Sequence, residues 1–233
     1  MQALLSIILA IVTFFSGIGG AFSSPGNIIW PWSRPGEVVT DRAAVIAIYR
    51  EIAAQNPNIE LRENIRITDY PSIPLVPMGT VRTAVNLAFA FSNTTRDGMP
   101  GNPAAIAVGD LRLARAEYFN NGRTVVITLE PNAQTDGFNG QANAGPVGRT
   151  IGVLGTQVQG ILGVLAGLPG LGLGADVMST LVRVRYVNPT VTIRADTRTG
   201  RILSAEYSYD FVLEIPLPLV PNFRIGASYR LST

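Results

Sequence analysis

Three carboxylates on one predicted strand come closest, by type and spacing, to a catalytic set. Glu206, Asp210 and Glu214 recur every four residues, so on a strand they share one face. At a rise of ~3.3 Å per residue, neighbouring members lie about 13 Å apart. Glycosidase carboxylates lie about 5 to 9.5 Å apart. A hydrolase would therefore need a further carboxylate from another strand, and a solvated polar face explains the pattern more simply.

The residue types that are absent exclude most other chemistry. The 233 residues include no histidine, cysteine or lysine, and all 18 basic residues are arginine. Without imidazole, thiol or amine, the chain cannot perform Ser-His-Asp or Cys-His catalysis, form a lysine Schiff base, or hold zinc through histidine or cysteine. We therefore predict a protein that is not an enzyme and that has no cofactor and no metal site.

The charge balance argues against a nucleic-acid partner. The formal net charge is +2, and only 15% of the residues are charged. The arginines are scattered along the chain and do not alternate with aromatic residues at a regular spacing. A nucleic-acid-binding domain usually concentrates basic residues on one face.

The first residues predict contact with a membrane. Residues 3–22 contain no charge, and a helix of that length spans about 30 Å, the thickness of the bilayer's hydrocarbon core. Residues 1–23 are either a cleaved signal peptide or an uncleaved anchor, because the Ala-Phe-Ser at 21–23 fits a cleavage site but the start lacks Lys and Arg. The predicted lipid contacts are Leu4, Leu5, Ile7, Ile8, Leu9, Ile11, Phe14 and Phe15.

The domain organisation follows from this segment. Residues 24–40 carry three prolines, two tryptophans and two glycines, and they predict a stalk. Residues 41–233 are predicted to form a single α+β domain. We expect the protein at the cell membrane, crossing it once with the domain outside the cytoplasm, or secreted if the leader is cleaved.

Apolar spacing predicts one amphipathic helix and several strands. A helix is expected over 41–55, with Thr40 as its N-cap and apolar residues at i, i+3, i+4 and i+7. Apolar and polar residues alternate over 81–91, 203–215 and 225–231, and a further strand is expected near 61–67. Such alternation is typical of an antiparallel sheet with one buried face. We predict a curved antiparallel sheet of about six to eight strands.

Turn residues place two hairpins and one irregularity. The Asn-Asn-Gly-Arg sequence at 120–123 predicts a tight turn between strands near 110–119 and 124–130, and residues 196–200 predict a second, with Gly200 in the left-handed region. At Asn188-Pro189 the alternation changes phase, which predicts a bulge or a strand break.

Two segments have unusual composition. Residues 131–146 are rich in Asn, Gln and Gly, and we expect a loop there. Residues 150–175 carry eight glycines and many apolar residues; they predict a glycine-rich helix over about 147–167. That helix could pack closely on the sheet or contact lipid or a partner helix. With the helix over 41–55 it would cover the sheet, behind the amino-terminal apolar helix.

These observations favour a binding module outside the cytoplasm, tethered or exported, whose partners are membrane lipid and either a hydrophobic ligand or an envelope protein. An envelope assembly protein that recruits others is the alternative, and a carboxylate-based hydrolase is less favoured. Arg183 and Arg185 share a strand face and could meet phosphate head groups or an acidic partner, although a polar sheet face explains them as well. The predicted ligand-binding residues are Phe89, Phe91, Tyr207, Tyr209 and Phe211.

Overall fold

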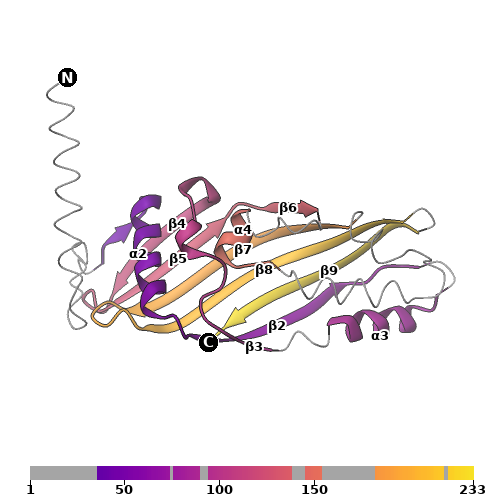
Figure 1. Cartoon of the computed structure of the whole chain (residues 1–233), viewed down its shortest axis with the longest axis horizontal. Coiled ribbons are helices and arrows are strands. Elements are labelled where there is room, and N and C mark those ends of the chain that lie inside the picture. The colour runs from indigo at the N-terminus through magenta and orange to yellow at the C-terminus, as the bar shows by residue number, and fades with distance from the viewer. Residues whose placement is uncertain (1–35, 74–75, 90–93, 138–144, 154–181, 218–219) are drawn as a thin grey trace, which may run out of the picture.

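The computed structural model describes residues 36–73, 76–89, 94–137, 145–153, 182–217 and 220–233. Within these ranges nine strands form one sheet in the order β1-β4-β5-β7-β8-β9-β2-β3, with β6 paired to β7 (Figure 1). Every pair is antiparallel. The predicted antiparallel sheet with few helices is confirmed. The predicted signal or anchor segment and most of the predicted stalk lie outside the described residues.

Three long strands form the largest part of the sheet. The strands are β1 Val38–Val39, β2 Glu60–Asp69, β3 Thr95–Asp97, β4 Leu111–Phe119, β5 Thr124–Pro131, β6 Gln134–Gly137, β7 Arg183–Asp196, β8 Ile202–Leu217 and β9 Val220–Ser232. The described strands exceed the six to eight expected, because β1, β3 and β6 are too short to show a repeating pattern. The helices are α2 Arg42–Gln55, α3 Met78–Phe89 and α4 Pro146–Thr150, with 3-10 turns η2 Pro103–Ala105 and η3 Val108–Asp110.

Both predicted hairpins are confirmed. The β4–β5 turn places Asn120 and Asn121 at φ 53° and 55°, in the left-handed region that asparagine tolerates. The β7–β8 turn has Gly200 at φ 65°. In that turn the Asp196 carboxylate accepts hydrogen bonds from the backbone of Arg198 and Thr199 at 2.9 Å each. These turns fix the register of the four strands that they join.

The predicted irregularity in β7 is also confirmed. The pairing of β7 with β8 shifts between Val187 and Thr190, and Asn188 has φ 52°. Before the shift Val184 and Tyr186 are buried, and after it Val191 is buried. One extra residue therefore keeps apolar side chains on the same side of the sheet along the whole strand.

The strand predicted over 81–91 is wrong, because residues 78–89 form the helix α3. Val81 and Val85 are 2% and 1% exposed, which is the i, i+4 spacing of a helix, whereas Leu87 is 58% exposed. Alternation and helical spacing both include 81, 85 and 89, so the pattern alone did not separate them. Pro77 precedes the helix, and its carbonyl accepts hydrogen bonds from the amides of Thr80 and Val81.

The predictions for 131–146 and 147–167 need correction. Part of the predicted loop forms β6, which pairs with β7 through residues 134–137. Of the predicted glycine-rich helix only residues 147–153 are described: the helix α4 ends at Thr150, and Gly152 has φ 85°, so these residues do not form one continuous helix. Residues 138–144 and 154–181 lie outside the described part of the chain.

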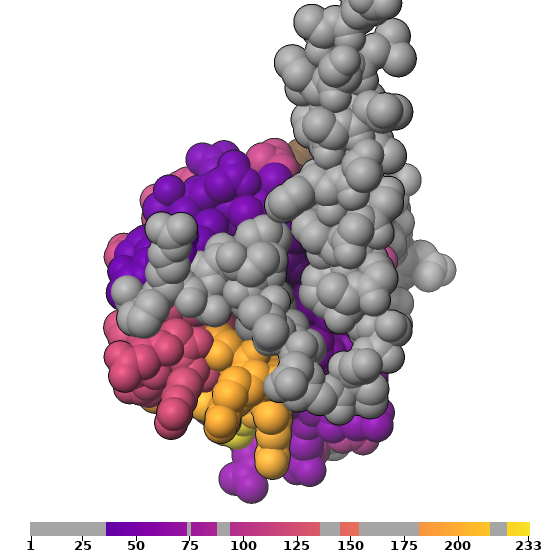
Figure 2. All heavy atoms as spheres, turned by 90° about the vertical axis from the view of Figure 1, so that its left-hand side faces the viewer, coloured from indigo at the N-terminus to yellow at the C-terminus, as the bar shows by residue number. Residues whose placement is uncertain are grey.

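The predicted helix over 41–55 is confirmed as α2, but Asp41 rather than Thr40 is its N-cap. The Asp41 carboxylate accepts a hydrogen bond from the Ala44 amide at 2.8 Å. Val45, Ile48, Tyr49 and Ile52 are at most 1% exposed. Figure 2 shows α2 beside the β4–β5 hairpin and the β7–β8 turn at one end of the molecule. This helix therefore covers only one end of the long sheet.

Among the described residues, no helix combines the length and the apolar character that crossing a bilayer requires.

Candidate functional site

The long strands have two unlike faces. We call the buried side of β2, β7, β8 and β9 the inner face and the opposite side the outer face. Six aromatic side chains lie on the inner face, each at most 4% exposed: Tyr186, Tyr207, Tyr209, Phe211, Phe223 and Tyr229. They come together because residues two apart share a face and because Tyr209 pairs with Tyr229, and Tyr186 with Phe211, across the strands.

Tyr209 is the centre of this aromatic group. Its ring stacks on Tyr229 at 4.7 Å between centroids and meets Tyr186 edge to face at 5.2 Å. Phe211 lies at 6.3 Å from it. Contacts of this kind contribute about 0.5 to 1.5 kcal/mol each beyond the area that they bury. The rings therefore form a rigid, largely apolar floor on the inner face.

The hydroxyl of Tyr209 is buried and has no hydrogen-bond partner among the described residues. The neighbouring Tyr207 hydroxyl, in contrast, donates to the Met99 sulfur at 3.6 Å. A buried polar group without a partner costs about 1 to 3 kcal/mol. Phenylalanine at position 209 would keep the ring contacts without that cost, so packing of the ring alone does not explain the hydroxyl.

One carboxylate lies at an apolar position of the same face. Glu63 of β2 is 7% exposed, in line with buried Leu61 and partly buried Ile65 on the same side of the strand. The Thr94 hydroxyl donates to it at 3.4 Å. A buried carboxylate is normally paired or hydrogen-bonded, because losing its hydration is costly. Glu63 thus adds a negative charge to the edge of the aromatic floor.

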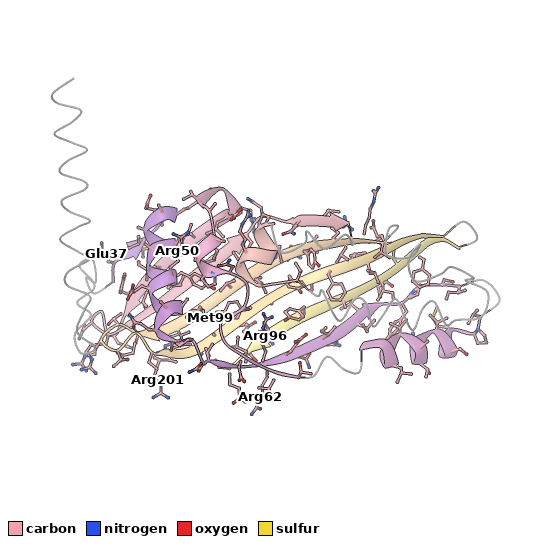
Figure 3. All side chains as sticks on the ribbon, in the orientation of Figure 1. Glu37, Arg50, Arg62, Arg96, Met99 and Arg201 are labelled. Carbon is pink, nitrogen blue, oxygen red and sulfur yellow. The ribbon has the colours of Figure 1, made fainter. Side chains whose placement is uncertain are left out.

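Arg96 of the edge strand β3 supplies the opposite charge. It pairs in register with Leu61, and Figure 3 shows it beside Met99 over the middle strands of the sheet. Unlike Glu63, the Arg96 side chain is exposed. Burial raises the pKa of Tyr229, the charge of Glu63 raises it further, and Arg96 opposes both. Two groups of opposite charge therefore lie at the edge of the aromatic floor: Glu63, which is buried, and Arg96, which is exposed to water.

The structure separates the predicted ligand-binding residues. Tyr207, Tyr209 and Phe211 lie together on the inner face. Phe89 is the last residue of α3 and does not belong to a strand, because the predicted strand there is a helix. Phe91 lies outside the described residues. The role of Tyr207, Tyr209 and Phe211 as ligand contacts stays a prediction, and their common location supports it.

Sequence reasoning missed Glu63, Arg96, Tyr186 and Tyr229 as members of this site. Glu63 had a signal, because it is an acidic residue within the apolar positions 61, 65 and 67 of a predicted strand. Tyr229 was visible only as an apolar position of a strand. Arg96 had no signal, since its place over the sheet depends on the segment that connects α3 to β4.

The outer face holds the three carboxylates of β8. Glu206 accepts from the Arg230 guanidinium at 2.9 Å, and Asp210 accepts from the Ser228 hydroxyl at 2.6 Å. Glu214 lies 3.9 Å from Arg185 and 3.8 Å from Arg224. No residue paired in register with any of the three is acidic within the described sheet.

A metal site is not formed by the described residues, in which no three acidic side chains gather to hold an ion. Glu130, the residue before the last of β5, instead pairs with Arg112 at 2.6 Å.

Comparison with known proteins identifies no relative. No family model matches the chain, and no curated protein matches it either. A solved structure of a Hippeastrum protein, studied as an adenylyl cyclase and found to have a dominant triphosphatase activity, aligns over 84% of this chain and 77% of its own. The identity is 6% and the TM-score 0.11, so this similarity carries no argument about fold or function.

Proposed function

We propose that this chain is a non-enzymatic binding module whose inner face holds a hydrophobic ligand that carries a hydrogen-bonding group. In this proposal the amino-terminal residues anchor the module in a membrane or direct its export, with the sheet outside the cytoplasm. The ligand's apolar part lies on the aromatic floor of the inner face.

The Tyr209 hydroxyl is the observation that carries the proposal. It is buried at the centre of the aromatic floor and has no partner among the described residues. A ligand with a hydroxyl, ester or carboxyl group would satisfy it, and the rings around it would bury the ligand's hydrocarbon. Glu63 and Arg96 at the rim suit a polar end of such a ligand, because polar groups at the rim of an apolar site fix orientation.

The experiment compares Tyr209→Phe with Tyr118→Phe in the full chain. Tyr118 is the matched control, because it is also buried with an unpartnered hydroxyl but lies on β4, away from the aromatic floor. Each protein is purified in the same detergent, and the small molecules extracted from it are measured by mass spectrometry per mole of protein. Lipid carried by the micelle or by the amino-terminal stretch is common to all samples and cancels.

We expect a near-stoichiometric compound in the unmodified protein and in Tyr118→Phe. In Tyr209→Phe its amount falls about tenfold, because one buried hydrogen bond of about 1.4 kcal/mol is lost. Equal amounts of every extracted compound in the three proteins would remove the proposal.

A scaffold module that recruits envelope proteins is the second candidate. It is supported by the tight burial of the inner face, where Tyr207 and Phe211 are 0% and 1% exposed. If that packing does not open, the face stabilises the sheet and partners bind elsewhere. A protein that co-purifies one-to-one with both tyrosine variants, without any bound small molecule, would favour this function.

A carboxylate-based hydrolase has the least support. It needs two carboxylates in one cleft, and the strand partners of Glu206, Asp210 and Glu214 are not acidic within the described sheet. Release of sugar from purified envelope polymer, lost in Glu206→Gln, would favour it.

A further inference from the structure

One segment of the chain crosses the inner face of the sheet. Residues 98–110 leave β3 at one edge and enter β4, and the strand order places β2, β9, β8, β7 and β5 between those two strands. The crossing is on the inner face, because Met99 packs against the buried core and its sulfur accepts a hydrogen bond from the Tyr207 hydroxyl at 3.6 Å. In Figure 1 the segment crosses the sheet beside α2.

The later part of this segment is firmly attached. Arg50 of α2 donates to the carbonyls of Pro103 and Ile106 at 3.1 and 2.6 Å. Asp110 pairs with Arg149 of α4. The turns η2 and η3 also fall within this part of the segment. We therefore expect any movement of the segment in the residues before Pro103.

The first four residues of the segment are attached mainly at their two ends, and we call residues 98–101 the flap. At the ends, the amides of Gly98 and Asn102 donate to neighbouring carbonyls at 2.8 and 2.7 Å. Between these two amides, the backbone of the flap makes no hydrogen bond to any residue that the structure describes. Packing and the contact of the Met99 sulfur with Tyr207 hold it in place.

The sequence of the flap allows it to move as a unit. Gly98 and Gly101 have φ 87° and 69°, in the region that glycine adopts readily and other residues rarely do. Pro100 fixes its own φ and restricts Met99 to extended conformations. Two adaptable residues therefore flank two stiff ones, as in a short lid with a hinge at each end.

The aromatic floor is closed to solvent. Tyr207 and Tyr209 are 0% and 2% exposed, so a ligand reaches their rings only when a covering segment moves away. The strands that carry the rings do not supply this movement, because β7, β8 and β9 are each paired on both sides. The flap, in contrast, can leave Tyr207 without breaking a strand or a helix.

We propose that the flap is the gate through which the ligand reaches the aromatic floor, and that Met99 is its latch. This inference rests on the proposed function, because it supposes that the floor binds a ligand. When the flap opens, Met99 leaves Tyr207, and the hydroxyl and ring of Tyr207 become available to the ligand. The latch holds the gate closed with and without ligand, so it slows binding and release equally and leaves the affinity unchanged.

The experiment removes the latch and then rebuilds it. The chain has no cysteine, so Met99→Cys introduces a single thiol. Methyl methanethiosulfonate converts this thiol into a methyl disulfide, with methanesulfinate as the leaving group. The resulting side chain has the length of methionine, and a reductant reverses the change. Met78→Cys is the matched control, because Met78 is 43% exposed on α3.

The probe is dansyl-aminoundecanoic acid, which combines a hydrocarbon chain with a carboxyl group. Full-length proteins are compared in the same detergent, and detergent alone gives the signal of probe in micelles. Stopped-flow mixing of protein with probe measures the binding rate. Mixing of the loaded protein with excess dodecanoic acid measures the release rate, and titration measures Kd.

We expect Met99→Cys to raise both rates about five- to tenfold, because the buried end of the side chain and its contact with Tyr207 are lost. Its Kd should change less than about twofold. Methylation of the thiol should restore both rates, which also shows that the variant is folded. Met78→Cys should leave the rates unchanged, methylated or not. Tyr209→Phe should instead raise Kd about tenfold, as expected of a ligand contact.

Unchanged rates in Met99→Cys would overturn the gate while leaving the proposed function intact. A change in Kd as large as the change in release rate would also overturn it, because Met99 would then be a ligand contact. Absence of saturable probe binding, or a Kd that Tyr209→Phe does not alter, would refute the proposed function and the gate with it.

Discussion

Along β8, consecutive residues enter opposite environments. Tyr207, Tyr209 and Phe211 are buried on the inner face, while Glu206 and Asp210 between and beside them face water and pair with groups of the next strands. The inner face is stabilised by apolar burial, at about 25 cal/mol per Å². Exposed ion pairs such as those of the outer face contribute about 0 to 1 kcal/mol each. The inner face therefore determines stability, and the outer face contributes little to it.

Alkaline pH should break the inner face as a whole. Burial raises the pKa of Tyr49, Tyr207, Tyr209 and Tyr229, and raises that of Tyr118 to about 12. Each of these tyrosines has a folded-state pKa above the unfolded value of about 10, so its neutral form stabilises the folded state. That contribution to the free energy of unfolding is complete below pH 10 and is lost as the pH rises toward the folded pKa values.

We therefore expect cooperative unfolding between about pH 10 and 12. Lysine and cysteine are absent, so tyrosine is the side chain that titrates in this range. Circular dichroism and tyrosinate absorbance should change together. Tyrosinate formation at pH 12 in a protein that keeps its native circular dichroism would contradict the buried aromatic face.

Adjacent residues allow the sharpest comparison of the two faces. Phe211→Ala should lower the free energy of unfolding by about 3 to 5 kcal/mol, because it leaves a cavity in the inner face. Val212→Ala, one residue away on the outer face, should cost less than about 1 kcal/mol. Urea denaturation of both variants measures the difference. Similar costs would mean that both faces of β8 are equally buried.

The buried ion pair between Asp110 and Arg149 is the next effect in size. It joins η3 to α4, and Asp110 also accepts a hydrogen bond from the Ala107 amide at 2.7 Å. Burial alone would raise the pKa of Asp110, but the hydrogen bonds from Arg149 and Ala107 lower it overall. The ionised Asp110 therefore contributes to the stability of the folded state above about pH 4, its unfolded pKa. This contribution is lost as the pH falls through the folded pKa.

Asp110→Asn should cost about 2 to 4 kcal/mol at neutral pH, because it leaves Arg149 partly buried without its carboxylate. The variant should also lose less stability than the unmodified protein when the pH falls from 5 to about 3. Urea denaturation at several pH values checks both. An unchanged acid dependence would show that other carboxylates dominate.

The outer ion pairs should give the smallest effect. Glu206→Gln breaks the pair with Arg230, whose side chain is 60% exposed, and should change the free energy of unfolding by about 0.5 kcal/mol or less. A double-mutant cycle with Arg230→Gln measures the coupling. A coupling above about 2 kcal/mol would show that the outer face also contributes to stability.

The sequence predicted correctly the strands whose apolar pattern fits only a strand. It failed where the pattern fits both a strand and a helix. The alternation of β8 and β9 and the asparagine-glycine turn at 120–122 predicted strands that the structure confirms. Residues 81–89 satisfied both a strand and a helix, and only packing against the rest of the chain decided for α3. Strand β6 was not predicted, since its pairing with β7 comes from a segment of loop-like composition.

The candidate site shows the same division. Tyr207, Tyr209 and Phe211 share a face because residues two apart on a strand do so, which the sequence alone determines. Their contacts with Tyr186 and Tyr229 depend on strand order and register, and the position of Glu63 and Arg96 beside them depends on pairing between segments more than a hundred residues apart. The local sequence pattern predicts which side chains of a strand are buried together. Which strands lie next to it depends on long-range pairing, and only the tertiary structure determines that.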